Sequence, residues 1–221
     1  MPFSPRKRFH AAAVATATAA ALLFPGADGP GAGQARAQEA APRATTIKRV
    51  ETYLNSIKTL RARFLQISPT GEVARGTVLI SRPGKLRIEY DPPSPVLILT
   101  QGSYLMLFDK DLQSPSYAPL DDSLAGFLVR PEIRLSGDVQ VRKLTQAKGV
   151  IRLSIVQTES PEAGTLTLVF NDGPLSLRQW VIVDAQGGET RVSLVNPQFN
   201  VEIDPSKFEF TLPEEEEFDR E

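Results

Sequence analysis

Side chains able to carry out covalent or acid–base chemistry are few in this sequence of 221 residues. It contains no cysteine, and its single histidine, His10, lies in a segment that we predict is removed. A Ser-His-Asp triad, a Cys-His pair and a zinc site built from cysteine and histidine therefore cannot form in the remaining chain. We accordingly expect no catalytic residue, no metal ion and no cofactor, and hence a protein that is not an enzyme.

Motifs for nucleotide and calcium binding are missing or incomplete. Neither GxxxxGKS/T nor GxGxxG occurs. Asp109-Lys110-Asp111 resembles the start of a calcium loop, but Ser114 takes the sixth position, which needs glycine, and Leu120 the twelfth, which needs glutamate. No spacing selects a carboxylate pair for glycoside hydrolysis, and Trp180, the only tryptophan, fits core packing better than a sugar platform. A carboxylate-based glycan hydrolase remains a distant alternative.

Arg82 is the polar residue whose position is most informative. It ends a strand-like segment and precedes Pro83-Gly84, and Val78 and Ile80 fall on the same side of this strand by a period of two. An arginine at the rim of an apolar face can direct its five N–H donors to exposed backbone carbonyls of a covering element. The alternative is an ordinary surface arginine before a turn, and the residues alone favour this alternative.

The N-terminus has the features of a cleaved secretory signal peptide over residues 1–37. Arg6-Lys7-Arg8 precedes an apolar run from Phe9 to Phe24, and Ala35-Arg36-Ala37 supplies a small-residue cleavage site. The run is shorter than the about 20 apolar residues of a spanning helix. Cleavage after Ala37 leaves 184 residues with 21 basic and 25 acidic side chains, a formal net charge of −4. We therefore expect an exported, soluble and acidic chain that does not bind nucleic acid.

The rest of the chain is predicted to form one domain, residues 45–213, between a flexible leader at 38–44 and an acidic tail at 214–221. Four apolar residues at helical spacing begin this domain: Ile47, Val50, Leu54 and Ile57. They predict one amphipathic helix that starts at Thr45 or Thr46, either of which can cap it.

After Leu60 the hydrophobic period changes to two, and turn-forming pairs such as Gln101-Gly102 separate the segments. Ten strands are expected: Ala62–Ile67, Gly76–Ser81, Lys85–Tyr90, Val96–Thr100, Tyr104–Phe108, Val139–Leu144, Val150–Val156, Thr165–Phe170, Leu177–Val183 and Thr190–Val195. Between Pro119 and Pro131, apolar residues at helical spacing predict a short capped helix, and Asp204-Pro205-Ser206 predicts a single helical turn. Such consecutive hairpins are typical of an antiparallel meander that curls toward a barrel.

Two neighbouring strands carry apolar residues on both faces. Lys85–Tyr90 alternates between polar and apolar residues, whereas Val96–Thr100 and Tyr104–Phe108 do not. Because an antiparallel sheet usually leaves one face to water, strands without a polar face must be covered twice. Either they lie inside a closed, fully packed barrel, or they belong to an open barrel whose concave face holds an apolar ligand.

An ordered set of motifs over Thr45 to Pro213 resembles the periplasmic outer-membrane lipoprotein carrier family (LolA-type). The matching residues are Phe64-Leu65-Gln66, Gly76, Ile80-Ser81-Arg82-Pro83-Gly84, Arg87-Ile88-Glu89-Tyr90, Pro92-Pro93, Gln101-Gly102, Asp184-Ala185-Gln186-Gly187, Thr190, Asn200-Val201-Glu202-Ile203 and Phe208-Glu209-Phe210-Thr211-Leu212-Pro213. The resemblance implies a mainly β protein with flanking helices (α+β), an unclosed antiparallel half-barrel with a helical lid over an apolar concave face.

The resemblance also implies a function, namely a periplasmic chaperone that shields the acyl chains of lipoproteins and ferries them to the outer membrane. Its partners would be acylated lipoproteins, an ATP-driven inner-membrane release complex and an outer-membrane acceptor, for which a lipoprotein of the same fold is a candidate. The carrier would act as a monomer. The alternative from another class is a half-barrel sensor that binds lipids or lipoproteins and reports the state of the envelope.

Site residues follow from the same resemblance. In this family the arginine of the Arg-Pro motif ties the lid shut through hydrogen bonds, which implies this role for Arg82. The lid helices would carry Leu54, Ile57, Leu124, Phe127 and Leu128. The acyl cavity would be lined by Leu86, Ile88, Ile98, Met106 and Phe108. The sequence does not show which face of Val96–Thr100 is concave, and the opposite parity would invert that list.

Overall fold

The computed structural model describes residues 32–121 and 123–211, of which residues 32–41, 124 and 125 are described without their side chains. The chain divides into two compact units, Met1–Gln38 and Glu39–Glu221, and the second contains every described strand. Most of the predicted signal peptide and all of the predicted acidic tail lie outside the described residues. The boundaries at residues 37 and 213 therefore stay predictions.

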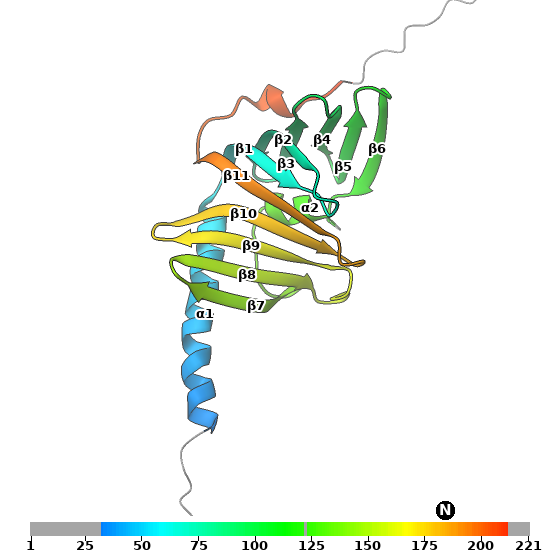
Figure 1. Ribbon diagram of the computed structural model, residues 1–221. Coiled ribbons are helices and arrows are strands. Elements are labelled where there is room, and N and C mark those ends of the chain that lie inside the picture. The colour runs from blue at the N-terminus through cyan, green and yellow to red at the C-terminus, as the bar shows by residue number, and fades with distance from the viewer. Residues whose placement is uncertain (1–31, 122, 212–221) are drawn as a thin grey trace, which may run out of the picture. The chain divides into compact units, whose positions relative to one another are not determined.

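Eleven described strands form one sheet in the second unit (Figure 1). They are β1 Thr59–Ile67, β2 Val73–Ser81, β3 Lys85–Tyr90, β4 Val96–Gln101, β5 Tyr104–Asp109, β6 Ser114–Pro119, β7 Val139–Ala147, β8 Val150–Gln157, β9 Gly164–Asp172, β10 Leu175–Asp184 and β11 Glu189–Phe199. Their order is β6-β5-β4-β3-β2-β1-β11-β10-β9-β8-β7, and each neighbouring pair is antiparallel. Since β6 and β7 are the two edges, the sheet is unclosed, which confirms the predicted half-barrel.

Strand β6 was missed by the sequence analysis. Its sequence, Ser-Pro-Ser-Tyr-Ala-Pro, has two prolines and no apolar alternation. Proline cannot donate a ladder hydrogen bond and is therefore confined mainly to edge strands, where one side needs no partner. β6 is such a strand, because it pairs only with β5.

Helices α1 (Ala32–Ser56) and α2 (Leu124–Val129) and the 3₁₀ turn η1 (Pro205–Phe208) complete the fold. α2 and η1 occur where the sequence predicted them. α1 begins before Thr45, so residues 38–44 are helical and not the expected flexible leader. Four alanines within residues 35–41 favour a helix there, although α1 also contains Pro42. In the part of the chain that the structure describes, no helix has the length and apolarity needed to cross a bilayer.

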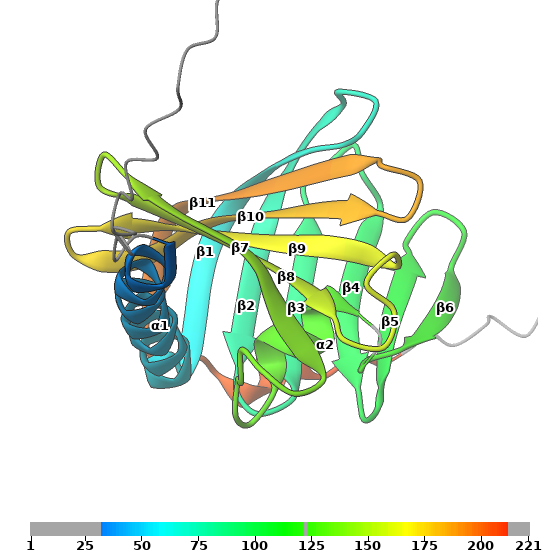
Figure 2. The same ribbon diagram turned by 90° about the horizontal axis from the view of Figure 1, so that it is seen from below.

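The sheet curls around α2, which lies between the β1–β6 half and the β7–β11 half (Figure 2). Register shifts in β1, β7 and β10 accompany this curvature, as β-bulges do in other curved sheets. The concave face and the two helices enclose the main hydrophobic core, to which α1 contributes Val50 and Leu54. Both side chains are almost completely buried, which confirms the face predicted from their spacing.

A second apolar cluster lies on the outer face of β4 and β5, the face turned away from α2. Its buried members are Leu97, Leu99, Met106 and Phe108. Phe210, just beyond η1, packs against it, with the ring centroids of Phe108 and Phe210 4.9 Å apart. The doubly apolar strands therefore obtain their second cover from the C-terminal segment.

Candidate apolar-ligand site and its latch

A cavity of about 280 Å³ lies between the concave face of the sheet and α2. The strands contribute its apolar lining: Phe64, Val78, Leu86, Ile88, Ile98, Leu105, Trp180, Ile182 and Val192. α2 adds Leu128, and the polar lining consists of Gln66, Tyr90, Ser123 and Thr190. None of these described lining residues is charged. The cavity can therefore hold an aliphatic group without desolvating a charge.

Two of the polar lining residues, Gln66 and Tyr90, are hydrogen-bonded to each other. The Tyr90 hydroxyl donates to Gln66 Oε1 at 2.8 Å, and the Phe64 ring packs edge-on against Tyr90 with centroids 5.2 Å apart. Burial raises the pKa of Tyr90. Tyr90 is therefore neutral at physiological pH and adds no charge to the cavity.

The predicted cavity residues Leu86, Ile88 and Ile98 line this cavity. Tyr90, Trp180, Val78 and the other lining residues were not predicted, although Tyr90 shares the period-two face of Leu86 and Ile88. The alternation of β3 was thus the signal that could have found it.

Met106 and Phe108, also predicted to line the cavity, lie instead on the outer face of the sheet. Met106 pairs with Leu99 and therefore shares its face, and the inward-facing residue of β5 that lines the cavity is Leu105. Since β5 is apolar on both faces, its sequence carries no signal that distinguishes the two parities. The prediction for these two residues is corrected accordingly.

Arg82 directly follows β2 and reaches two elements that cover the cavity. Its N–H groups donate to Leu54 O (2.7 Å), Ile57 O (3.1 Å), Asn55 Oδ1 (3.3 Å), Arg130 O (2.8 Å) and Pro131 O (3.3 Å). The first three oxygens belong to the end of α1 and the residues after it, and the last two follow α2. One side chain thus joins β2, α1 and the segment after α2.

The electrostatics of Arg82 differ from those of a salt bridge, because all five acceptors carry no net charge. Burial lowers the pKa of its guanidinium, which still remains protonated at neutral pH. The last carbonyls of a helix lack intrahelical donors and lie at the negative end of its dipole. Arg82 therefore supplies donors to oxygens at the end of α1, of which Leu54 O also accepts from Ile57 N at 3.3 Å.

Two further residues of α1 bind the segment after α2, and the sequence analysis missed both. Asn55 donates to Ile133 O at 2.7 Å and accepts from Ile133 N at 2.9 Å. Glu51 accepts from Leu135 N at 2.7 Å. Glu51 and Asn55 are four residues apart and so share one side of α1, which is the only signal the sequence offers for them.

The predicted lid residues have different positions. Leu54 and Ile57 are buried in the main core, and their carbonyl oxygens accept hydrogen bonds from Arg82. We call the hydrogen bonds of the Arg82 guanidinium to α1 and to the segment after α2 the latch. Leu128 lines the cavity, whereas Phe127 faces a neighbouring groove. Leu124 begins α2, but its side chain lies outside the described part of the chain.

The start of α2 is tightly built. Ser123 caps it by accepting from Gly126 N at 3.0 Å. A Cβ at Gly126 would lie 1.9 Å from the carbonyl oxygen of Leu120, so only glycine allows this approach.

No group of three or more histidine, cysteine, aspartate or glutamate side chains suited to a metal ion occurs within the described residues.

The fold and the site together define a class of protein, an unclosed half-barrel with a lidded apolar cavity that can enclose an apolar ligand. The family model described as "Outer membrane lipoprotein carrier protein LolA" matches residues 55–211. The chain belongs to this family.

Curated relatives and solved structures are similar over most of the chain. A protein of Pseudomonas aeruginosa named outer-membrane lipoprotein carrier protein is 29% identical over 203 residues, covering 86% of this chain and 93% of the relative. Its namesake from Azotobacter vinelandii is 29% identical over 182 residues, covering 76% and 85%. The crystal structure of a LolA superfamily protein from Nitrosomonas europaea covers 74% of this chain and 97% of its own, with 12% identity and a TM-score of 0.42.

Proposed function

We propose that this protein is a periplasmic carrier that shields the acyl chains of lipoproteins and ferries them from the inner membrane to the outer membrane, without enzymatic activity. The observation that carries this proposal is an uncharged apolar cavity beneath a helix that one arginine holds in place. Membership of the family and the names of the relatives from P. aeruginosa and A. vinelandii support it.

A carrier has to hide acyl chains without retaining them. Each buried CH₂ contributes about 0.8 kcal/mol, so an acyl chain does not cross an aqueous compartment unaided. Opening the lid for an acyl chain would break the hydrogen bonds of Arg82, and a buried group left without a partner costs about 1–3 kcal/mol. This cost would make the loaded state less stable relative to the empty one and would favour transfer to an acceptor.

The partners proposed for this cycle are an ATP-driven release complex in the inner membrane and an acceptor in the outer membrane. A monomeric carrier exported through a cleaved signal peptide fits both encounters. The family resemblance supports these finer assignments.

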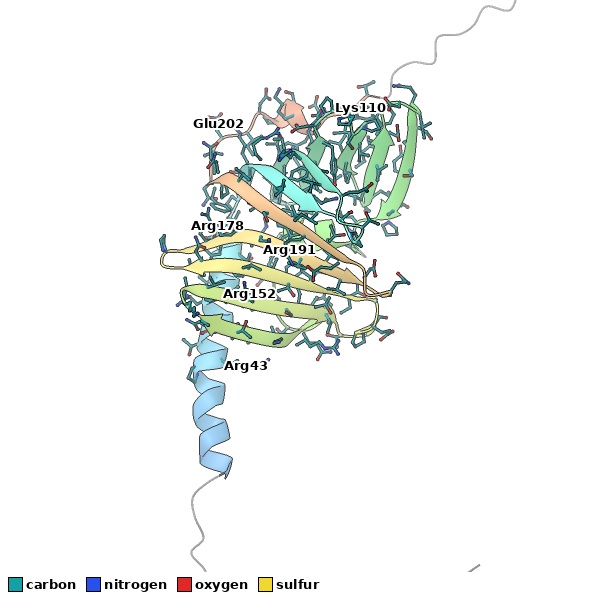
Figure 3. The ribbon with its side chains drawn as sticks, viewed as in Figure 1. Arg43, Lys110, Arg152, Arg178, Arg191 and Glu202 are labelled. Atoms are coloured by element: carbon teal, nitrogen blue, oxygen red, sulfur yellow. The ribbon has the colours of Figure 1, made fainter. Side chains whose placement is uncertain are left out.

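Native mass spectrometry of the protein from periplasm tests the proposal. The full precursor is expressed in a Gram-negative host as wild type, as Arg82→Leu to slow release, and as Arg178→Leu. Arg178 is an exposed arginine of β10 that makes no hydrogen bond or ion pair with the described residues, and it is the matched control (Figure 3). We expect a chain that starts near Gln38 and carries a lipoprotein or an acyl mass, most abundantly in Arg82→Leu.

The other outcomes contradict the proposal in different ways. A processed chain that stays empty even as Arg82→Leu would favour the sensor of envelope state. An unprocessed chain would contradict export to the periplasm.

A further inference from the structure

A groove of about 830 Å³ adjoins the apolar cavity. Phe127 of α2 and Val139, Ile155 and Leu166 of the β7–β9 strands supply apolar walls. Ser123, just before α2, and Ile182 of β10 line both the cavity and the groove, so the two spaces lie side by side at these residues. The groove is therefore a neighbouring surface for the part of a ligand that lies outside the cavity.

The groove differs from the cavity in charge. Its lining includes one guanidinium, Arg130, and four carboxylates, those of Asp121, Asp138, Glu159 and Asp184. Two of these carboxylates have structural partners, because Asp138 pairs with Arg130 at 2.7 Å and Asp184 accepts from the backbone N–H groups of Gln186 and Gly188.

Asp121 and Glu159 are exposed, and their carboxylates make no hydrogen bond or ion pair with any residue the structure describes. Their charges are uncompensated, and the groove carries an excess of negative charge at its rim. An aliphatic chain gains nothing from such a rim, because carboxylates must keep their hydration. A polypeptide can contact both the apolar walls and the acidic rim of the groove, because it carries apolar side chains as well as polar groups.

We propose that this groove binds the polypeptide segment directly after the acylated residue of a lipoprotein, and that Asp121 and Glu159 favour basic over acidic side chains in that segment. The inference rests on the proposed carrier function. An acyl chain in the cavity is covalently tethered to its polypeptide, which must therefore lie on a surface next to the cavity. The groove is such a surface, because Ser123 and Ile182 line both spaces. Its carboxylates give it a charge preference that the uncharged cavity does not have.

Two synthetic lipopeptides with the same triacylated cysteine test the groove. One continues with Ser-Lys-Lys-Lys-Lys and the other with Ser-Glu-Glu-Glu-Glu, and each displaces an apolar fluorophore from the purified chain lacking residues 1–37. Because exposed ion pairs are individually weak, we expect the lysine lipopeptide to bind about threefold to tenfold more tightly at low salt. The preference disappears in 1 M salt, where the screening length is about 3 Å.

The double variant Asp121→Asn, Glu159→Gln is expected to lose the preference while it still binds both lipopeptides. Neither carboxylate has a structural partner among the described residues, so the fold should be retained. The matched control is Glu72→Gln, an exposed carboxylate outside the groove, which should keep the full preference.

The outcomes separate the groove from the carrier function. Equal binding of both lipopeptides, or a preference that survives the double variant, would contradict the proposed role of the groove. Neither result would contradict the carrier function. Failure of both lipopeptides to displace the fluorophore overturns the carrier function and the groove together.

Discussion

Arg82 holds three parts of the molecule together through the direction of its donors, and no carboxylate contributes to this contact. Guanidinium nitrogens meet carbonyl oxygens of α1 and of the segment after α2 in a fork that lysine, with its single ammonium group, cannot reproduce. The absence of a counter-ion also means that salt should affect this contact less than it affects a surface ion pair.

Arg82→Leu is predicted to retain bound lipopeptide and to slow its release to acceptor vesicles. The substitution removes the guanidinium donors to the oxygens of α1 and of the segment after α2. The empty closed state therefore loses stability, and the loaded state is no longer disfavoured. Release of a fluorescent triacylated lipopeptide, followed in time, measures the effect, and Arg178→Leu should release at the wild-type rate. Release from Arg82→Leu at the wild-type rate would show that the hydrogen bonds of Arg82 do not control release.

Glu89 should make stability depend on pH. Lys110 donates to Glu89 Oε1 at 2.8 Å and Arg87 to Oε2 at 2.9 Å, and the pKa of Glu89 is lowered, chiefly by Lys110. Figure 3 shows Lys110 beside the outer face of the sheet. A carboxyl whose pKa is lower in the folded state stabilises the fold above its unfolded value of about 4.5, and this contribution is lost as the pH falls through the folded pKa.

The variant Glu89→Gln is therefore expected to unfold more easily at pH 7, by about 0.2–1 kcal/mol for a partly exposed pair. The difference from wild type should shrink as the pH falls below about 4.5 and through the lowered pKa of Glu89. Urea unfolding at a series of pH values measures it, and a difference that is constant with pH would exclude the ion pairs as its cause.

At the scale of elements, α2 depends on a close approach that only glycine permits. Gly126→Ala places a Cβ 1.9 Å from the carbonyl oxygen of Leu120, so α2 has to shift away from its cap. Such overpacking costs about 1–3 kcal/mol, and we expect faster uptake of an apolar fluorophore into the cavity. Gly173→Ala is the control, because a Cβ there meets no atom within 4 Å. Unchanged uptake in Gly126→Ala would show that α2 does not limit access.

The C-terminal segment covers the outer face of β4 and β5, as α2 covers the concave face of the sheet. Phe210→Ala would uncover the cluster around Phe108, and we expect a loss of about 1–2 kcal/mol in unfolding free energy. Because the cavity lies on the opposite face, lipopeptide affinity should be unchanged. Thermal unfolding and fluorophore displacement measure the two quantities, and a parallel loss of affinity would show that the faces are coupled.

On the scale of the whole second unit, the curved sheet borders two adjacent spaces, the cavity and the groove. The β1–β11 pairing joins the two meanders, and the unpaired edges β6 and β7 leave room for α2 between the halves. The uncharged cavity and the acidic groove lie side by side at Ser123 and Ile182, which line both. A single short helix therefore affects access to both spaces.

Several features of this protein were determined by the sequence alone, because they follow from local periodicity. The spacing of Val50 and Leu54 defines the buried face of α1, and the alternation of β3 places Leu86 and Ile88 on the concave face. Antiparallel hairpins follow from turn residues between runs of period two. The Arg-Pro motif marked Arg82, although its acceptors were not identifiable.

Only the tertiary structure decided the rest, for two physical reasons. β5 is apolar on both faces, so Met106 and Phe108 turn outward because Phe210 covers them, and a cover so distant in sequence leaves no local signal. The acceptors of Arg82 are mostly backbone carbonyls, which every residue possesses and no residue type marks. The packing of α1 and α2 against the sheet decides which carbonyl oxygens Arg82 can reach. The same packing places the cavity and the groove side by side.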